Sequence, residues 1–92
     1  MIRSVVIAES AQKQLRKVPR YVAEKLADWT LAVEAYGLEE IRKVAGYHDE
    51  PLKGKRAGQR SIRLSRAYRA IYIISNGALE FVSVEEMHKH DY

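Results

Sequence analysis

YRAIYIISNGALEFVSVE, residues 68–85, places two runs rich in β-branched and aromatic residues on either side of Asn76-Gly77. Asn-Gly between two such runs is the strongest short-range indication of a β-hairpin, because both residues accept the positive φ that a two-residue type I′ turn requires. We therefore expect strands over residues 68–75 and 78–85. A two-residue turn also sets the register. The expected pairs are Tyr72 with Phe81, Ile71 with Val82, and Arg69 with Val84.

The residues before the hairpin change from a helical to an alternating pattern. Over residues 20–36, apolar side chains recur at steps of three and four, which places them on one face of a helix. These side chains are Val22, Leu26, Trp29, Val33 and Tyr36. Gly37 then provides a natural helix terminator. Residues 61–65 alternate instead, with Ile62 and Leu64 on one face, and this alternation predicts a third strand.

The N-terminal residues complete the expected fold. Residues 2–7 (IRSVVI) predict a strand, residues 8–18 a helix with Ser10 as candidate N-cap, and residues 38–45 a short third helix. One sheet with helices on one face is the economical arrangement of these elements. We therefore expect a single α+β domain over residues 1–92, with an N-terminal strand, a helical hairpin and then three antiparallel strands. The first strand pairs within that sheet, and the opposite face is left open.

Composition limits the classes of function. With 16 Lys and Arg against 12 Asp and Glu, the net charge is +4, which favours an anionic partner and nucleic acid first of all. The absence of cysteine excludes disulfides and thiolate metal sites. No apolar run approaches the roughly 18 residues that span a membrane, and the N-terminus lacks a secretory signal pattern. We expect a cytoplasmic protein without a membrane partner.

One segment carries much of the positive charge. Residues 51–79 contain no acid but seven cations, which are Lys53, Lys55, Arg56, Arg60, Arg63, Arg66 and Arg69. A loop of Lys and Arg beside a strand that carries Arg is typical of nucleic-acid binding, and a solvated strand face is the alternative for Arg63. Arg69 begins an apolar strand and therefore needs a partner, which is either Glu85 or Glu86 of this chain or an anion from outside.

Residues at the edges of the basic segment are candidates for proton transfer. Glu50 precedes it, where a carboxylate either pairs with Lys53 or acts as general base on a ribose hydroxyl. His88, His90 and Tyr92 follow the last strand, whose end returns to the level of Arg69. A His there can exchange a proton, and Tyr92 can stack on a base. Two His at this spacing can also bind a metal, but no third ligand is evident. We expect no metal and no cofactor.

These features resemble the RelE/ParE superfamily of bacterial type II toxins, and the resemblance covers the whole chain in element order. EPLKG at residues 50–54, the stretch 58–63, YRAIY at residues 68–72 and a C-terminal His and Tyr are similar to the RelE and YoeB branch. The chain departs from that pattern at its end, where KHDY replaces a final His-Tyr. Either His90 or His88 is then the counterpart of the family's His. Gln59 and Arg60 also stand where the YoeB-like pattern has aromatic residues.

The resemblance implies an activity and partners. Members of that branch cut mRNA on the ribosome without a metal, by attack of the ribose 2′-OH on the adjacent phosphate. The implied catalytic residues are Glu50 as general base, Arg69 for the transition state, His90 as general acid and Tyr92 to orient the scissile nucleotide. The implied RNA-binding residues are Lys53, Lys55, Arg56, Arg60 and Arg63, of which Arg63 also helps Arg69. The implied partners are the ribosome, mRNA and a cognate antitoxin encoded by a neighbouring gene, through which oligomers mainly form.

Two other functions stay open from the sequence. ParE-like proteins share the fold and inhibit DNA gyrase without cutting RNA, and they have no need of a combination of Glu, Arg, His and Tyr. A relative that has lost catalysis only binds RNA or an antitoxin. The EPLKG motif favours ribosome-dependent mRNA cleavage over gyrase inhibition.

Overall fold

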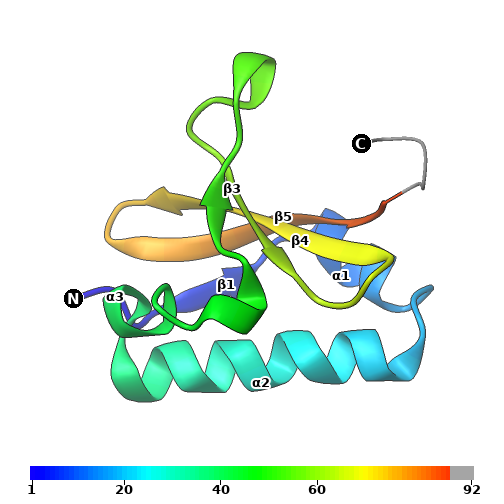
Figure 1. Ribbon diagram of the computed structural model, residues 1–92, viewed down its shortest axis with the longest axis horizontal. Coiled ribbons are helices and arrows are strands. Elements are labelled where there is room, and N and C mark those ends of the chain that lie inside the picture. The colour runs from blue at the N-terminus through cyan, green and yellow to red at the C-terminus, as the bar shows by residue number, and fades with distance from the viewer. Residues whose placement is uncertain (88–92) are drawn as a thin grey trace.

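The computed structural model describes residues 1–87 and contains one five-stranded sheet with helices on one face (Figure 1). In chain order the elements are β1 (Val5–Ile7), α1 (Glu9–Leu15), α2 (Arg20–Tyr36), α3 (Leu38–Ile41), a 3₁₀ turn (Ala45–Tyr47), β2 (Glu50–Pro51), a second 3₁₀ turn (Gly54–Arg56), β3 (Arg60–Arg63), β4 (Tyr68–Ser75) and β5 (Ala78–Glu86). The expected α+β class is confirmed. None of the helices within residues 1–87 is both long and apolar enough to cross a membrane.

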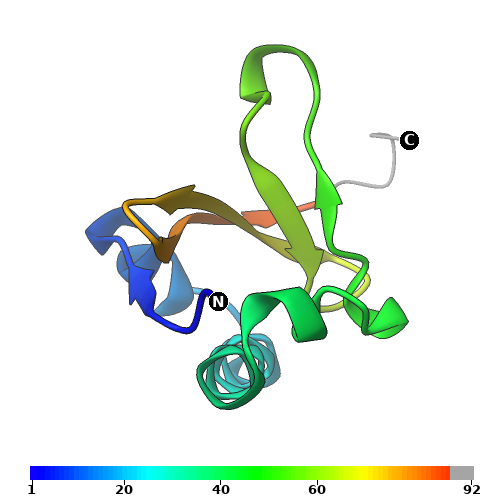
Figure 2. The same ribbon diagram turned by 90° about the vertical axis from the view of Figure 1, so that its left-hand side faces the viewer.

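The strand order is β1-β5-β4-β3-β2. β1 runs parallel to β5 at one edge, and the other neighbouring pairs are antiparallel. The helices cover one face, while the turn between β2 and β3 rises from the other (Figures 1 and 2). The predicted pairing of the first strand within the sheet is confirmed. The sheet has one strand more than predicted, because Glu50 and Pro51 pair with β3 over a stretch too short to show a period.

The β4–β5 hairpin has the predicted bounds to within one residue. Asn76 and Gly77 both have positive φ, +53° and +77°, as a type I′ turn requires. Tyr72 lies opposite Phe81, as the turn predicted. The turn chemistry therefore determines the first half of this hairpin.

The register beyond Tyr72 differs from the prediction because of a β-bulge between Ile71 and Tyr72. A bulge inserts one extra residue into one strand, here Val82 of β5, and moves every later pair by one. The pairs found are Ile71 with Ser83 and Arg69 with Glu85, instead of Ile71 with Val82 and Arg69 with Val84. The bulge thus brings an acid opposite the arginine.

α1 is attached to the sheet at the bulge. The helix covers Glu9–Leu15 rather than residues 8–18, and the prediction of Ser10 as N-cap is wrong, because the helix already begins at Glu9. The Ser10 hydroxyl instead donates a hydrogen bond of 3.0 Å to the carbonyl oxygen of Val82. This bond gives the carbonyl of the bulged residue a partner.

The core lies between α2 and the sheet. The buried positions of α2 are Val22, Leu26, Trp29 and Val33, as predicted. The ring centroid of Trp29 is 5.7 Å from that of Tyr72 and 5.3 Å from that of Phe81, and all three side chains are fully buried. Tyr36 was predicted on the same face but is 65% exposed, since it is the last residue of the helix and lies past the buried stripe. The aromatic cluster joins α2 to the β4–β5 hairpin.

The N-terminal segment pairs with the sheet over fewer residues than predicted. β1 begins at Val5 rather than at residue 2, because the backbone of Ile2 is bonded to α3 instead. The carbonyl of Ile2 accepts a hydrogen bond of 2.8 Å from the N–H of Leu38, and its own N–H donates to the Glu39 carboxylate at 3.2 Å. α3 covers Leu38–Ile41 and is shorter than the predicted 38–45, since a 3₁₀ turn begins at Ala45.

Gly77→Ala should lower the free energy of unfolding by about 1 kcal/mol, because an L side chain is strained at the positive φ of this position. Open space surrounds the added Cβ, so the cost comes from the backbone alone. Gly46→Ala is the control, since Gly46 is also surrounded by open space but has no positive φ. Urea unfolding followed by circular dichroism measures both variants. Equal stabilities of the two would contradict the type I′ turn.

Candidate functional site

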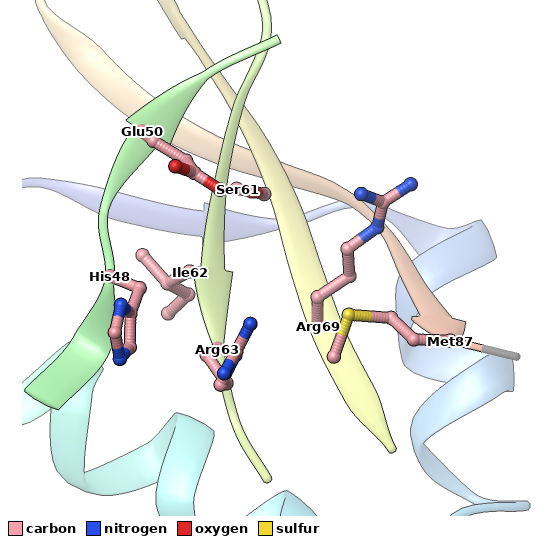
Figure 3. A pocket seen from close by; sticks show the side chains of 7 residues that line it. All are labelled: His48, Glu50, Ser61, Ile62, Arg63, Arg69 and Met87. Atoms are coloured by element: carbon pink, nitrogen blue, oxygen red, sulfur yellow. The ribbon is translucent and has the colours of Figure 1, made fainter. Parts of the chain in front are cut away.

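A pocket lies across β2, β3 and β4 on the sheet (Figure 3). Its lining residues are His48, Glu50, Ser61, Ile62, Arg63, Arg69 and Met87. Glu50 on β2 lies at one side and Arg69 on β4 at the other, with β3 between them. Two strand spacings, roughly 10 Å between backbones, separate β2 from β4. Long side chains from both strands can therefore reach one shared ligand.

Alternation along β3 places Arg63 in this pocket. Ile62 is fully buried in the core, so the side chains of Ser61 and Arg63 on either side of it point to the face away from the helices. Ser61 is buried there, while Arg63 is exposed. Glu50, Arg63 and Arg69, which the sequence singled out separately, thus line one pocket. Their catalytic roles stay predictions.

Other predicted site residues lie away from the pocket or outside the structure. Lys53 and Lys55 are exposed on the turn between β2 and β3, and neither lines the pocket. His90 and Tyr92, the predicted acid and orienting residue, and the alternative acid His88 lie outside the described residues. Their predicted roles are therefore not tested by the geometry.

Arg56 and Arg60, two of the predicted RNA-binding residues, are engaged by acids of the same chain. Arg56 forms an ion pair with Glu85 of β5, and Arg60 forms one with Asp49, just before β2. The side chains of Arg56 and Arg60 are 39% and 27% exposed. These two guanidinium groups are committed to carboxylates in this structure.

Glu85 stands at the centre of a cluster of donors. Both Nη atoms of Arg56 donate to its two carboxylate oxygens, Nη2 of Arg69 donates at 3.2 Å, and the hydroxyl of Ser83 donates at 2.9 Å. The hydrogen bonds from Arg56 are the main cause that lowers the pKa of Glu85 from 4.5 to about 2. The same contact raises the pKa of Arg56. Glu85 is therefore ionised at any physiological pH.

Glu85 is also the partner that Arg69 required. The sequence left open whether Arg69 pairs with an acid of this chain or with an external anion. The bulge places Glu85 opposite Arg69, and the two side chains form an ion pair. Among the described residues, only one of its nitrogens donates a hydrogen bond, and its buried Nε has no partner there. Arg69 thus keeps donors for a ligand in the pocket.

A second network holds the residue next to Glu50. The Asp49 side chain is fully buried, and its carboxylate accepts hydrogen bonds from Nε of Arg60 at 2.7 Å and from the Tyr72 hydroxyl at 2.6 Å. Nε of Arg42 donates to the same hydroxyl at 3.3 Å. Burial, and next the hydrogen bond to Asp49, raise the pKa of Tyr72 to about 12. The Tyr72 hydroxyl is therefore a stable donor to Asp49 at neutral pH, and this bond fixes the backbone that carries Glu50.

Sequence reasoning missed four residues of the pocket, His48, Ser61, Ile62 and Met87, of which Ile62 was predicted only as a core residue. His48 has a positive φ of +49°, and this backbone conformation has no marker in the sequence. The sequence offered one indication of its role, which is its position two residues before Glu50. A pocket at the start of β2 also includes residues that precede this strand. Ser61 was correctly placed on the outer face of its strand but was not considered as a site residue.

The pocket brings together two kinds of groups that phosphate chemistry uses. Glu50 is exposed and offers a carboxylate that can accept a proton. Arg63 and Arg69 offer planar groups of N–H donors that match the oxygens of a phosphate. Within residues 1–87, no group of three or more His, Cys, Asp or Glu side chains is arranged to hold a metal ion. The carboxylate and the two guanidinium groups thus favour an anionic ligand that carries a hydroxyl group.

Several solved structures share this fold. The YoeB/ParE toxin from Agrobacterium tumefaciens is 21% identical, with a TM-score of 0.70 over 92% of this chain and 99% of that chain. YafQ from E. coli is 20% identical, with a TM-score of 0.69 over 92% and 93%. The YoeB–YefM complex from Staphylococcus aureus is 15% identical, with a TM-score of 0.69 over 92% and 97%. No family model and no curated protein matches the sequence. The chain therefore has the RelE/ParE toxin fold that its motifs predicted.

Asp49→Asn should lower the free energy of unfolding by about 3 kcal/mol, because the partly buried guanidinium of Arg60 loses its anionic partner. Asp28→Asn is the matched control, since Asp28 is exposed on α2 and forms no ion pair among the described residues. Urea unfolding at neutral pH measures both variants. An Asp49→Asn protein as stable as the control would show that the network contributes nothing.

Glu85→Gln should alter how stability depends on pH. A carboxyl whose pKa is lowered from 4.5 to about 2 stabilises the fold above pH 4.5 and loses this contribution as the pH falls to about 2. The variant should therefore be less stable than the wild type by roughly 1–3 kcal/mol at neutral pH, and the difference should shrink below pH 4.5. Unfolding curves taken at several pH values test this. A difference that stays constant down to about pH 2 would contradict the lowered pKa.

Proposed function

We propose that this chain is the toxin of a type II toxin–antitoxin pair. Support comes from the likeness of its fold to structures described as toxins, and two of the similar structures are complexes, RelBE2 from Mycobacterium tuberculosis and YoeB–YefM from Staphylococcus aureus. On this proposal the partner is an antitoxin encoded by a neighbouring gene, and oligomers form mainly through it. The toxin then acts in the cytoplasm.

We further propose that the toxin is an endoribonuclease that cuts mRNA on the ribosome. The observation that carries this proposal is the pocket, where the Glu50 carboxylate lies across from Arg63 and Arg69 (Figure 3). Cleavage of RNA by its own 2′-OH needs a base for the hydroxyl proton and cations for the charge that builds on phosphorus. An inhibitor that only binds gyrase needs neither.

In the proposed reaction, Glu50 accepts the proton of the ribose 2′-OH while the 2′ oxygen attacks the adjacent phosphorus. Arg69, helped by Arg63, donates hydrogen bonds to the non-bridging oxygens as their negative charge increases. The bond between phosphorus and the 5′ oxygen breaks, and the general acid supplies the proton to that oxygen, which leaves a 2′,3′-cyclic phosphate. The C-terminal His90, or alternatively His88, is the proposed acid, and Tyr92 orients the scissile nucleotide.

Lys53 and Lys55 are the proposed contacts to the mRNA backbone. Both are exposed on the turn that rises from the open face of the sheet (Figure 2). Each lysine that neutralises a phosphate releases counterions, so binding weakens as the salt concentration rises. The proposed reaction uses no metal and no cofactor.

Arg69→Ala should abolish growth arrest when the protein is produced in bacteria, and it should slow mRNA cleavage in a translation extract by about 100-fold or more, because a donor to the transition state is lost. Arg66→Ala is the matched control, since Arg66 is an exposed cation of the same acid-free segment that does not line the pocket. Circular dichroism checks that both variants fold. Primer extension maps the cleavage sites, which should lie at codons in the ribosomal A site.

Equal arrest by the wild type and Arg69→Ala would contradict the catalytic assignment. Altered DNA supercoiling with intact messages would instead favour gyrase inhibition. Binding to RNA or to an antitoxin without any arrest would identify a module that has lost catalysis.

A further inference from the structure

Glu85 is an acid in the middle of a face that otherwise attracts anions. Glu85 lies on β5, which is paired with β4, and its carboxylate accepts four hydrogen bonds. The donors are a guanidinium fork from Arg56, a single N–H from Arg69 and the hydroxyl of Ser83. A fork from one arginine together with single donors from neighbours is also how proteins hold a phosphate group. The carboxylate thus occupies a place where a phosphate would fit.

The two arginines are occupied to different degrees. Arg56 directs both of its Nη atoms to Glu85, so the Nη1–Nη2 edge of its guanidinium is occupied by the carboxylate. Arg69 directs only Nη2 to Glu85 and also lines the pocket. The Glu85 carboxylate therefore withholds Arg56 from an external anion to a greater extent than Arg69.

We propose that the Glu85 carboxylate acts as an internal substitute for an RNA phosphate, which withholds Arg56 and part of Arg69 and so limits how strongly this face binds a nucleic-acid backbone. The inference rests on the proposed function, because it concerns RNA binding at the same face. Its physical basis is competition, since a phosphate gains the two arginines only by displacing a carboxylate that is already bound to them.

This competition favours release of RNA over tight binding. Arg60 lies outside this competition, because it shares the helix face with Ile62 and is paired there with the buried carboxylate of Asp49. Lys53, Lys55 and Arg63 form no ion pair with any described residue and are free to bind phosphates. An enzyme that must leave one message and act on the next gains from a face whose affinity is limited, because uniformly tight binding of substrate does not raise the rate of the chemical step.

The salt dependence of binding measures how many cations take part. For single strands, the slope of log K against log salt concentration changes by about 0.7 for each phosphate neutralised. Glu85→Gln frees Arg56 and the withheld part of Arg69, so the slope should become steeper by about 0.7 to 1.4, and binding at 0.1 M salt should tighten by roughly tenfold. The probe is a single-stranded 2′-O-methyl RNA oligonucleotide with a fluorescent end, measured by anisotropy. This probe has no 2′-OH and cannot be cut by the proposed reaction.

Two further variants make the result specific. Glu80→Gln removes an acid from the same strand, and Glu80 forms no ion pair within residues 1–87. It causes the same change in net charge and should leave the slope unchanged. The double variant Arg56→Gln/Glu85→Gln removes the ion pair as a unit and frees only Arg69, so its slope should rise by about half as much. The double variant leaves no unpaired Arg56, so it can replace Glu85→Gln in the binding experiment if Glu85→Gln does not fold.

The outcomes separate this inference from the proposed function. A steeper slope for Glu85→Gln than for Glu80→Gln supports it, even if the wild type cuts no message on the ribosome. Equal slopes for these two variants, or no binding of the probe by any variant, would overturn it. Equal slopes together with normal mRNA cleavage by the wild type would overturn the inference and leave the proposed function intact.

Discussion

The hydrogen bond between the Tyr72 hydroxyl and the Asp49 carboxylate joins the core to the site. The ring of Tyr72 is fixed on one side by Trp29 and Phe81, so its hydroxyl has a fixed position at the border of the core. A fully buried carboxylate is costly unless it is paired, and Asp49 is paired only where it meets both Tyr72 and Arg60. The aromatic core therefore determines where β2 starts, and with it the position of Glu50.

The basic segment is held in place by acids rather than spread into solvent. Asp49 ties the base of the β2–β3 turn to the sheet through Arg60, and Glu85 ties its far side through Arg56. A run of cations without internal acids repels itself, and ion pairs with acids from other parts of the chain reduce that repulsion. The same acids divide the cations into those that build the structure and those that are free for a ligand. Charge counted along the sequence therefore overestimates the positive charge that this surface offers to a ligand.

Much of the fold follows from local chemistry in the sequence. Residues 20–36 and the Asn76-Gly77 hairpin were predicted closely, because a long apolar stripe and a type I′ turn are both local properties. The bulge at Val82 has no local marker of this kind, and its carbonyl is bonded by Ser10 of α1, a residue far away in the sequence. Its consequence is not local, because it decides that Arg69 faces Glu85. The sequence thus identified Glu50, Arg63 and Arg69, whereas the ion pairs of Arg56 and Arg60 required the three-dimensional contacts.

The pairing of β1 with β5 has a consequence for how the chain folds during synthesis. The first strand to be made lies parallel to the last strand of the described chain, and that last strand occupies an interior position in the sheet. Until β5 has left the ribosome, β1 and β4 have no common neighbour, and Trp29 lacks Phe81 as a packing partner. Contacts between residues so distant along the chain slow folding, and the sheet cannot be completed in stages from the N-terminus. Folding is therefore a late and concerted event, and partly synthesised chains do not contain the assembled pocket.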